Sequence, residues 1–204
     1  MAKIKICGLM RMEDIEAVNE AKPDYIGFVF AKGGKRTVSH ETAAELKRNL
    51  CPDIKAVGVF LNNSVEEVSA LADQGIIDII QLHGDEDEKY ITDLRSRTVQ
   101  PIVKAVRVRT EEEIFRAERL PVDYLLLDTY KKGAYGGTGE TFDWSRIPQL
   151  QKPFFLAGGL DESNITAAAG YGAYCLDVSS GAETDGKKDR QKIINLVRKV
   201  RSEL

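Results

Sequence analysis

Short apolar runs alternate with longer segments of helical periodicity along this chain of 204 residues, and the alternation predicts an α/β fold, a single small (β/α)8 TIM barrel. Eight such runs begin about every 25 residues, the length that a strand, a helix and two loops require. Several runs are apolar throughout, which suits parallel strands covered on both faces. Glycine-rich turns follow the last two runs, where barrels of this kind bind phosphate.

An open doubly wound sheet is the competing fold. That fold would place a glycine-rich dinucleotide motif directly after the first strand, where this chain reads Cys-Gly-Leu-Met-Arg (7–11). No polar edge strand is evident among the eight runs, which favours a closed barrel. The expected strands are residues 3–7, 25–30, 55–60, 77–82, 102–106, 123–128, 153–157 and 174–178.

The expected helices have recognisable starts. Ser64 with Glu67, and Thr110 with Glu113, have the spacing of a capping box, and each pair opens an amphipathic segment. The weak unit follows the sixth strand, where residues 129–141 are rich in glycine and threonine and only a short helix is expected at 143–150. Within it, Gly136-Gly-Thr-Gly139 lacks the Lys-Ser/Thr of a nucleotide P-loop, so a flap over the active site and an irregular connector both stay open.

Composition restricts the class of protein. The formal charge is −3, without the basic excess typical of nucleic-acid binders, and no apolar stretch approaches the length of a membrane span. Three separated cysteines without CxxC spacing indicate reduced thiols, and two histidines offer little for a metal site. We therefore expect one cytoplasmic domain covering residues 1–204, with no nucleic-acid or membrane partner and no metal.

Two residues stand where barrel enzymes keep their chemistry. Cys7 ends the first strand and Asp128 ends the sixth, so both open onto the same rim if the strands are parallel. A buried cysteine is often only a packing residue. A thiolate and a protonated carboxyl across a pocket would, however, form an acid–base pair that moves a proton within one molecule. Because a free thiol has a pKa of about 8.5, a base role for Cys7 requires positive charge nearby.

Further candidates lie on the same rim. Gly158 and Gly159 follow the seventh strand, and Ser180 and Gly181 follow the eighth, at the two positions of a phosphate cradle; tight turns are the alternative reading. Arg36 lies in a glycine-flanked loop after the second strand, where it would grip a carboxylate or remain solvated. His83 ends the fourth strand and is a candidate for substrate binding, proton transfer or a purely structural bond.

These residues belong to an ordered set of motifs that resembles the phosphoribosylanthranilate isomerases of tryptophan biosynthesis. The resemblance covers essentially the whole chain and includes Lys5-Ile-Cys-Gly-Leu9, Glu13-Asp14, Gly27-Phe-Val-Phe30, Lys35-Arg36-x-Val-Ser39, Val57-Gly-Val-Phe60, Gln81-Leu-His-Gly-Asp-Glu86, Gly136-Gly-Thr-Gly139 with Phe142-x-Trp144, Ala157-Gly-Gly-Leu160 and Leu176-Asp-Val-Ser-Ser-Gly181. The family pattern around Arg36 commonly has Ser before Lys/Pro-Arg and an aromatic after it; here Gly34 and Thr37 stand at those positions.

The resemblance implies a cofactor-free Amadori rearrangement of N-(5'-phosphoribosyl)anthranilate. By position, Asp128 would protonate the ring oxygen and Cys7 would remove the proton from C2. Arg36 would face the anthranilate carboxylate, and the two glycine loops would hold the phosphate. Asp177 would contact sugar hydroxyls or have a structural role.

Three alternatives compete with this function. The related sugar isomerase of histidine biosynthesis uses two aspartates, and Cys7 stands in place of the first. Indole-glycerol-phosphate synthase uses a lysine and a glutamate, a pattern that the first strand does not offer. The last alternative is a barrel that binds a phosphorylated ligand without catalysis. The chain ends after its eighth helix and is expected to stand alone, as a monomer in preference to a homodimer because no apolar surface stripe is evident.

Overall fold

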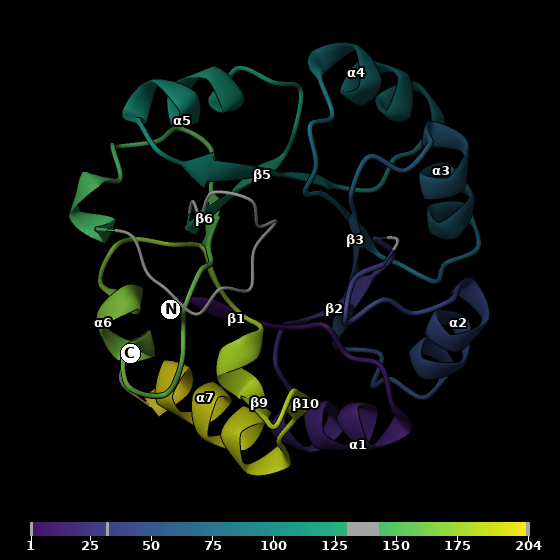
Figure 1. Cartoon of the computed structure of the whole chain (residues 1–204), viewed down its shortest axis with the longest axis vertical. Helices are drawn as coiled ribbons and strands as arrows, with labels where there is room; N and C mark the ends of the chain where they lie inside the picture. The colour runs from purple at the N-terminus through teal and green to yellow at the C-terminus, as the bar shows by residue number, and fades with distance from the viewer. Residues whose placement is uncertain (1, 32, 130–142, 203–204) are drawn as a thin grey trace.

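Eight parallel strands hydrogen-bond in sequence order, and the eighth pairs with the first, so the sheet closes into a barrel with the helices outside it (Figure 1). The structure, a computed structural model, describes residues 2–31, 33–129 and 143–202. The barrel strands are β1 (Lys3–Cys7), β2 (Tyr25–Val29), β3 (Lys55–Phe60), β4 (Ile79–Leu82), β5 (Ile102–Val108), β6 (Tyr124–Thr129), β7 (Phe154–Leu156) and β8 (Cys175–Val178). The predicted barrel is confirmed.

The helices alternate with these strands, as expected. They are α1 (Met12–Ala21), α2 (His40–Arg48), α3 (Val65–Asp73), α4 (Glu88–Arg97), α5 (Glu111–Glu118), α6 (Ile165–Ala169) and α7 (Arg190–Ser202). The expected short helix after strand six is a single 3-10 turn, η1 (Trp144–Arg146), and a second turn, η2 (Ser180–Ala182), follows β8. The segment Gly136–Gly139 lies outside the described residues.

Capping explains where several helices begin. The hydroxyl of Ser64 accepts the N–H of Glu67 and that of Thr110 accepts the N–H of Glu113, as their spacing predicts. Six strands differ from the expected bounds. β4 starts at Ile79 instead of 77, β5 extends to Val108, and β7 is shorter at both ends; β2, β6 and β8 differ by one residue at one or both ends. Pro153 has no N–H to give to a ladder, which accounts for the later start of β7.

Side chains of each strand alternate between two apolar layers. On β1, Ile4 and Ile6 pack in the larger layer, between the barrel and its helices. The smaller layer fills the barrel itself and contains Val57, Ile79, Val103, Leu126 and Phe155 among others. Lys5 and Cys7 alternate with the two isoleucines, so they point into the barrel instead.

Aromatic rings close the barrel at the amino-terminal end of its strands. The hydroxyls of Tyr25 and Tyr174 lie 3.0 Å apart, and Phe155 packs against both rings. The Nζ of Lys3 lies 5.4 Å and 5.0 Å from the centres of the two tyrosine rings. This packing leaves the opposite end of the barrel for a ligand site.

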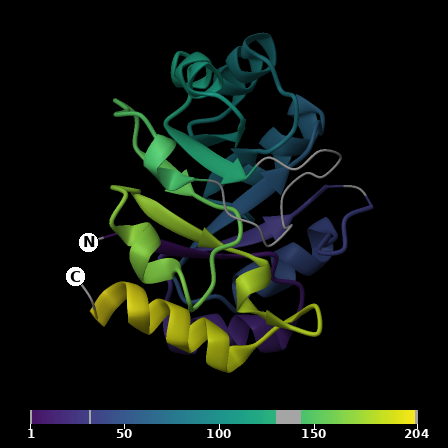
Figure 2. The same ribbon diagram turned by 60° about the vertical axis from the view of Figure 1, so that its left-hand side comes forward.

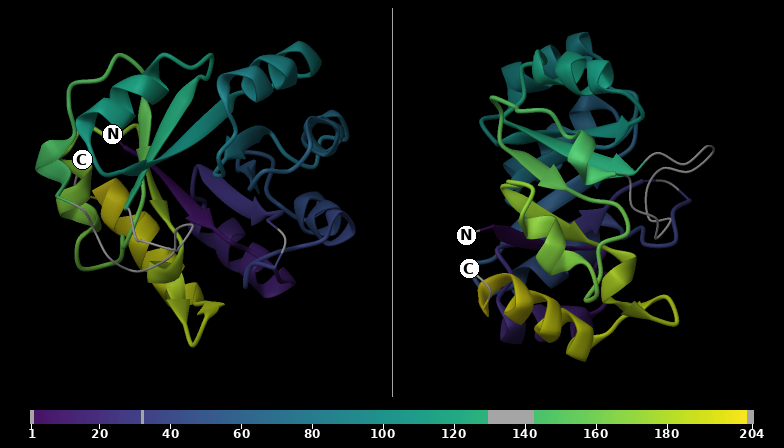
Figure 3. Two further views of the ribbon diagram at one scale, coloured as in Figure 1. Left: turned by 45° about the horizontal axis from the view of Figure 1, so that its top comes forward. Right: turned by 90° about the vertical axis from the view of Figure 1, so that its left-hand side faces the viewer.

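The carboxyl ends of the strands form that opposite end. A hairpin of β9 (Glu183–Thr184) and β10 (Lys187–Lys188) projects from it, while β1 begins and α7 ends at the far side (Figures 2 and 3). Because the hairpin lies between β8 and α7 in sequence, it can reach the loop after β2 across β1. Among the described helices, none is both long and apolar enough to cross a membrane.

Candidate active site

A cavity of about 560 Å³ opens at the carboxyl-terminal mouth of the barrel. Its lining includes eight of the nine residues singled out from the sequence: Cys7, Arg36, His83, Asp128, Gly158, Gly159, Asp177 and Ser180. The ninth, Gly181, lines an adjoining cavity of about 260 Å³ together with Gly159 and Ser180. Six of the eight strands, each taken with the loop that follows it, therefore contribute residues to one site.

Cys7 points into this cavity from the end of β1. Its thiol has room because the neighbouring position on β2 is a glycine: a Cβ on Gly27 would lie 2.6 Å from Cys7 Sγ. Burial raises the pKa of the Cys7 thiol, while the nearby ammonium groups of Lys5 and Lys188 act in the opposite direction. The positive charge that a base role requires is thus present, although the effect of burial on the pKa outweighs it.

Lys5 is a buried cation that contacts two residues of the cavity lining, and sequence reasoning did not select it. Its Nζ donates to Asp177 Oδ2 at 2.8 Å and to Gln81 Oε1 at 2.9 Å, and the residue is fully buried. Burial lowers the pKa of Lys5, but Asp177 and Cys7 outweigh burial, so the pKa is raised. A lysine on the inward face of β1, two residues before Cys7, was the signal that could have identified it.

A chain of polar contacts runs from Lys5 to Asp128 and determines how His83 carries its proton. An ammonium group only donates, so Gln81 presents its amide oxygen to Lys5 and its amide nitrogen to His83 Nδ1, at 2.9 Å. Nδ1 therefore accepts, and the hydrogen of the neutral ring is on Nε2, which lies 3.3 Å from Asp128 Oδ2. His83 thus faces Asp128 as a donor.

Asp128 is held from its other side by its own strand and by the loop after β7. Its Oδ1 accepts the backbone N–H of Thr129 at 2.8 Å. Gly158, at φ +91°, passes so close that a Cβ there would lie 2.9 Å from Oδ1 of Asp128 and 2.2 Å from Thr129 Oγ1. The carboxyl group is therefore fixed in direction, with Oδ2 on the cavity side near His83.

Asp177 combines a buried ion pair with an unused acceptor. Its Oδ2 binds Lys5, and it is register partner to Lys5 in the β1–β8 pair. Its Oδ1 is buried and has no hydrogen-bond partner among the described residues, although Asp177 lines the cavity. A buried carboxylate oxygen without a donor is costly, and because Asp177 lines the cavity this atom is available to accept a hydrogen bond there.

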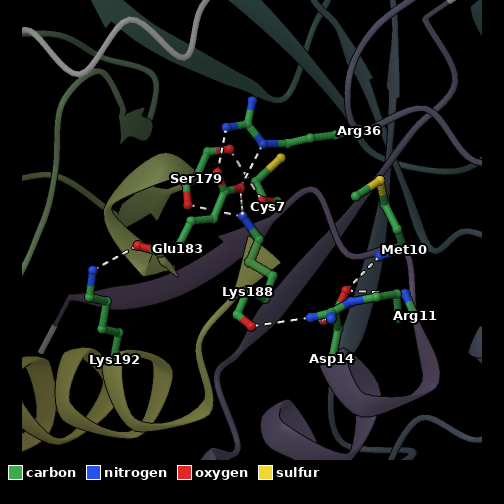
Figure 4. A network of polar contacts seen from close by, with 9 residues as sticks. All are labelled: Cys7, Met10, Arg11, Asp14, Arg36, Ser179, Glu183, Lys188 and Lys192. Atoms are coloured by element: carbon green, nitrogen blue, oxygen red, sulfur yellow. Dashed lines mark hydrogen bonds and ion pairs between the residues drawn. The ribbon is translucent and has the colours of Figure 1, made fainter. Parts of the chain in front are cut away.

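Arg36 reaches the cavity from the loop after β2, but it is not free. Glu183 of the β9–β10 hairpin binds it through two parallel contacts, Nε to Oε1 at 2.7 Å and Nη2 to Oε2 at 2.8 Å (Figure 4). Lys188 in turn donates to Glu183 Oε1 at 2.6 Å. Neither Glu183 nor Lys188 was selected from the sequence, because nothing in a run of charged residues distinguishes a buried pair from a solvated one.

The loops after β7 and β8 meet beside the smaller cavity. Ser180 and Gly181 begin η2, ahead of its first backbone bond from Ala182 N–H to Ser179 O, so their N–H groups have no acceptor within that turn. Gly181 must be glycine, since a Cβ would lie 2.0 Å from Leu160 O. Asn164 is the N-cap residue of α6, but its side chain makes no capping bond and donates to Gly159 O at 2.9 Å, in the preceding loop.

Comparisons with known proteins agree with this geometry. The model of the N-(5'-phosphoribosyl)anthranilate (PRA) isomerase family matches residues 4–199. The N-(5'-phosphoribosyl)anthranilate isomerase of Endomicrobium trichonymphae is 48% identical over 203 residues, which cover 99% of this chain and 100% of that protein. The protein of the same name from Thermoanaerobacter pseudethanolicus is 45% identical, and the match covers 98% of each chain.

Solved structures show the same resemblance. The phosphoribosylanthranilate isomerase of Thermotoga maritima superposes with a TM-score of 0.86 at 32% identity, covering 99% of this chain and 100% of that one. Another structure of such an isomerase, in complex with reduced 1-(o-carboxyphenylamino)-1-deoxyribulose 5-phosphate, superposes with a TM-score of 0.82 at 31% identity and the same coverage. The barrel, the cavity and these likenesses lead to one conclusion: this chain belongs to the N-(5'-phosphoribosyl)anthranilate isomerase family.

Proposed function

We propose that this chain isomerises N-(5'-phosphoribosyl)anthranilate to 1-(2-carboxyphenylamino)-1-deoxyribulose 5-phosphate, with Asp128 as the acid and Cys7 as the base. The observation that carries the proposal is the single cavity lined by a buried thiol, a buried carboxyl group, an arginine and the glycine turns after β7 and β8. The reaction belongs to L-tryptophan biosynthesis. The substrate has a group for each of these: a carbon acid beside a nitrogen for the acid–base pair, a carboxylate for the arginine, and a phosphate for the glycine turns.

In the first step Asp128 donates a proton to the furanose ring oxygen. The C1–O bond breaks, and the lone pair of the anthranilate nitrogen forms the C1=N bond of an iminium ion. Asp128 becomes a carboxylate, which accepts the N–H groups of Thr129 and His83 that already face it. His83 thereby stabilises the charge that proton donation creates.

In the second step the Cys7 thiolate removes the proton from C2. The electron pair of that C–H bond forms the C1=C2 double bond while the C1=N pair returns to nitrogen, which gives an enolamine. The enolamine becomes the ketone when C1 takes up a proton and the C2 hydroxyl group loses one. Lys5 and Lys188 favour the thiolate form that this step needs. Cys7 acts here as a base towards carbon, and no covalent bond forms between sulfur and substrate.

The remaining residues bind the two ends of the substrate. Arg36 faces the anthranilate carboxylate, and the turns at Gly158–Gly159 and Ser180–Gly181 hold the 5-phosphate through backbone N–H groups. Lys192 lines the smaller cavity and adds a positive charge there. Asp177 Oδ1 accepts a hydrogen bond from a sugar hydroxyl group.

We further propose that residues 1–204 form one domain that works as a cytoplasmic monomer. The pairing of β1 with β8 joins both ends of the chain in one sheet, which supports a single domain. Among the described residues, the exposed large apolar side chains are Val99, Phe115 and Tyr171, on three different segments. A solved relative is described as monomers of the dimeric Thermotoga maritima enzyme, so sedimentation equilibrium is the deciding measurement.

An assay of the proposed reaction tests the roles of both catalytic groups. The substrate is generated in situ and its fluorescence is followed as it disappears. We expect activity in the wild type and losses of at least about 10²-fold in Cys7→Ala and Asp128→Asn, the usual scale for a positioned acid or base. Cys51→Ala and Asp53→Asn, which change a cysteine and an aspartate outside the cavity, serve as controls. Normal turnover in Cys7→Ala would overturn the mechanism, and an inactive wild type would favour a binding protein.

A further inference from the structure

The contact between Arg36 and the β9–β10 hairpin has a function beyond holding the loop in place. We propose that Glu183 is a positioning residue for Arg36: it occupies one edge of the guanidinium group, so that the opposite edge is presented to the substrate carboxylate, and Lys188 keeps Glu183 in place. The inference rests on the proposed function, because the carboxylate is that of the anthranilate ring. It assigns a role to two residues outside the acid–base pair.

A guanidinium group offers two edges to carboxylates, one formed by Nε and Nη2 and one formed by Nη1 and Nη2. Glu183 occupies the first edge with contacts of 2.7 Å and 2.8 Å. Nη1 is directed away from Glu183 (Figure 4). The side chain of Arg36 keeps a quarter of its surface exposed and lines the main cavity, so the second edge is open to a ligand.

The stem of Arg36 is confined on the side of β1. A Cβ on Gly8 would lie 2.4 Å from Arg36 Cδ, which means that the arginine stem passes directly over the backbone of Gly8. Gly8 follows Cys7 in the chain, so the stem is located next to the proposed base. With a backbone on one side and Glu183 on the other, the guanidinium group has a defined plane.

Lys188 fixes Glu183 in turn. Its Nζ donates to Glu183 Oε1 at 2.6 Å and to Ser179 O at 2.9 Å, and its side chain is almost fully buried. Ser179 Oγ donates to Cys7 O at 3.3 Å. The carboxylate that orients Arg36 is therefore connected to the ends of β8 and β1, the same strands that carry the catalytic thiol and the phosphate turn.

The charge of this cluster matches its proposed ligand. Arg36 and Lys188 are cations and Glu183 is an anion, so the three carry a formal charge of one positive unit, which a single carboxylate neutralises. Burial raises the pKa of Glu183, but its bonds with Arg36 and Lys188 outweigh burial and lower it to about 2. Glu183 therefore stays ionised near neutral pH, and its grip on Arg36 persists when substrate arrives.

The competing interpretation is that the Arg36–Glu183 pair only ties the hairpin to the barrel. The two interpretations differ in what they predict for ligands with and without a carboxylate. A positioning role concerns only the ligand group that Arg36 binds. A purely structural role would affect the phosphate turn as well, since η2 leads directly into the hairpin, and would weaken both ligands alike.

The test compares Glu183→Gln with the wild type for two ligands: reduced 1-(2-carboxyphenylamino)-1-deoxyribulose 5-phosphate and the same molecule with a phenyl ring that lacks the carboxylate. We expect Glu183→Gln to weaken the first ligand by at least about tenfold and the second by less than about twofold, with the kinetic loss mainly in KM. Lys188→Met should show the same selectivity with a smaller effect. Glu20→Gln, which breaks a surface Glu–Arg pair with Arg190, is the matched control.

Three outcomes would overturn the inference: no change in Glu183→Gln, an equal loss for both ligands, or an unchanged effect of Glu183→Gln when Arg36 is already replaced by Met. When Arg36 is already replaced by Met, a positioning role predicts that Glu183→Gln weakens binding further by less than about twofold, because the group that Glu183 orients is gone. An inactive wild type would instead contradict the proposed function. The ligand comparison would still report on Arg36, because it measures binding alone.

Discussion

Nε2 of His83 lies 3.3 Å from Oδ2 of Asp128, at the end of a chain of contacts that starts from the buried ammonium group of Lys5. The direction of every hydrogen in this chain follows from the fact that Lys5 can only donate. Because Gln81 turns its amide oxygen to Lys5, it presents its amide N–H to His83 Nδ1. A single buried cation therefore sets the tautomer of a histidine across the barrel and provides Asp128 with a donor.

We predict that His83 is present as the Nε2–H tautomer and that Gln81→Leu weakens this preference. Without the amide, Nδ1 no longer has to accept and only the contact with Asp128 favours hydrogen on Nε2, so the Nδ1–H form becomes populated. Two-bond ¹⁵N–¹H spectra of histidine-labelled protein measure the tautomer directly. The chain has two histidines, so His40→Gln assigns the signals.

Measurements of kcat test the same series of contacts from Lys5 to Asp128 independently. We expect Gln81→Leu to lower kcat by about tenfold, since Asp128 then loses an oriented donor for the charge it acquires. Gln74→Leu, at the C-terminal end of α3, is the control for loss of a glutamine elsewhere. A His83 signal of the Nδ1–H tautomer in the wild type would contradict the hydrogen-bond directions assigned from Lys5 through Gln81 to His83.

The second prediction concerns the pH at which Cys7 becomes reactive. Burial raises the pKa of its thiol, so at neutral pH the thiolate is a smaller fraction than in a free cysteine. The rate of alkylation by iodoacetamide should therefore rise with pH and reach half its maximum above pH about 8.5. Mass spectrometry of the Cys7 peptide follows the reaction, with the half-buried Cys51 as internal control.

Removing the cation beside Cys7 should shift this profile further. In Lys5→Met the thiolate loses a favourable charge, so we expect alkylation at pH 8 to slow by about tenfold, one pKa unit. Because the single substitution leaves Asp177 buried without its partner, the double variant Lys5→Met/Asp177→Asn is measured as well. Faster alkylation of Cys7 in both variants would show that Lys5 does not favour the thiolate.

The fold was predictable because its signals are local. Strand periodicity, the capping hydroxyls of Ser64 and Thr110, and the glycine turns each depend on a few neighbouring residues, and all three recur in the structure. The strand ends were less certain. Pro153 marks where β7 cannot yet pair, but the extension of β5 to Val108 depends on its partner β6, which periodicity does not reveal.

The site was predictable only in part, for a physical reason. Cys7 and Asp128 were recognisable from their positions at strand ends, and the cavity brings them together. Lys5, Glu183 and Lys188 depend on contacts between segments up to 172 residues apart, such as Lys5 with Asp177. A charged residue is exposed or buried according to such partners, and the printed order of residues does not contain them.

The third prediction concerns a buried ion pair under the His83 loop. Lys104 Nζ lies 2.8 Å from Glu86 Oε2 and donates to Gly84 O at 2.7 Å, and both side chains are buried. Lys104→Met leaves the Glu86 charge without its partner, so we expect a loss of about 3–5 kcal/mol in the free energy of unfolding, measured with urea. Arg97→Met, which breaks an exposed pair with Glu66, should cost less than about 1 kcal/mol. Equal costs for the two variants would contradict the role of burial.

The last prediction separates backbone strain from close approach at Gly158. Gly158 and Gly172 both have positive φ, +91° and +74°, so alanine at either position costs about 1–2 kcal/mol of stability from the backbone alone. A Cβ on Gly172 meets nothing within 4 Å, whereas one on Gly158 would lie 2.2 Å from Thr129 Oγ1 and 2.9 Å from Asp128 Oδ1. Gly158→Ala must therefore displace the proposed acid, and we expect at least about a tenfold loss of kcat, because an error of about 1 Å in a catalytic group costs up to 10²-fold.

Gly172→Ala should keep kcat within about twofold at a similar backbone cost in stability. Full activity in Gly158→Ala would mean that Asp128 tolerates displacement, which a general acid held by Thr129 and His83 should not.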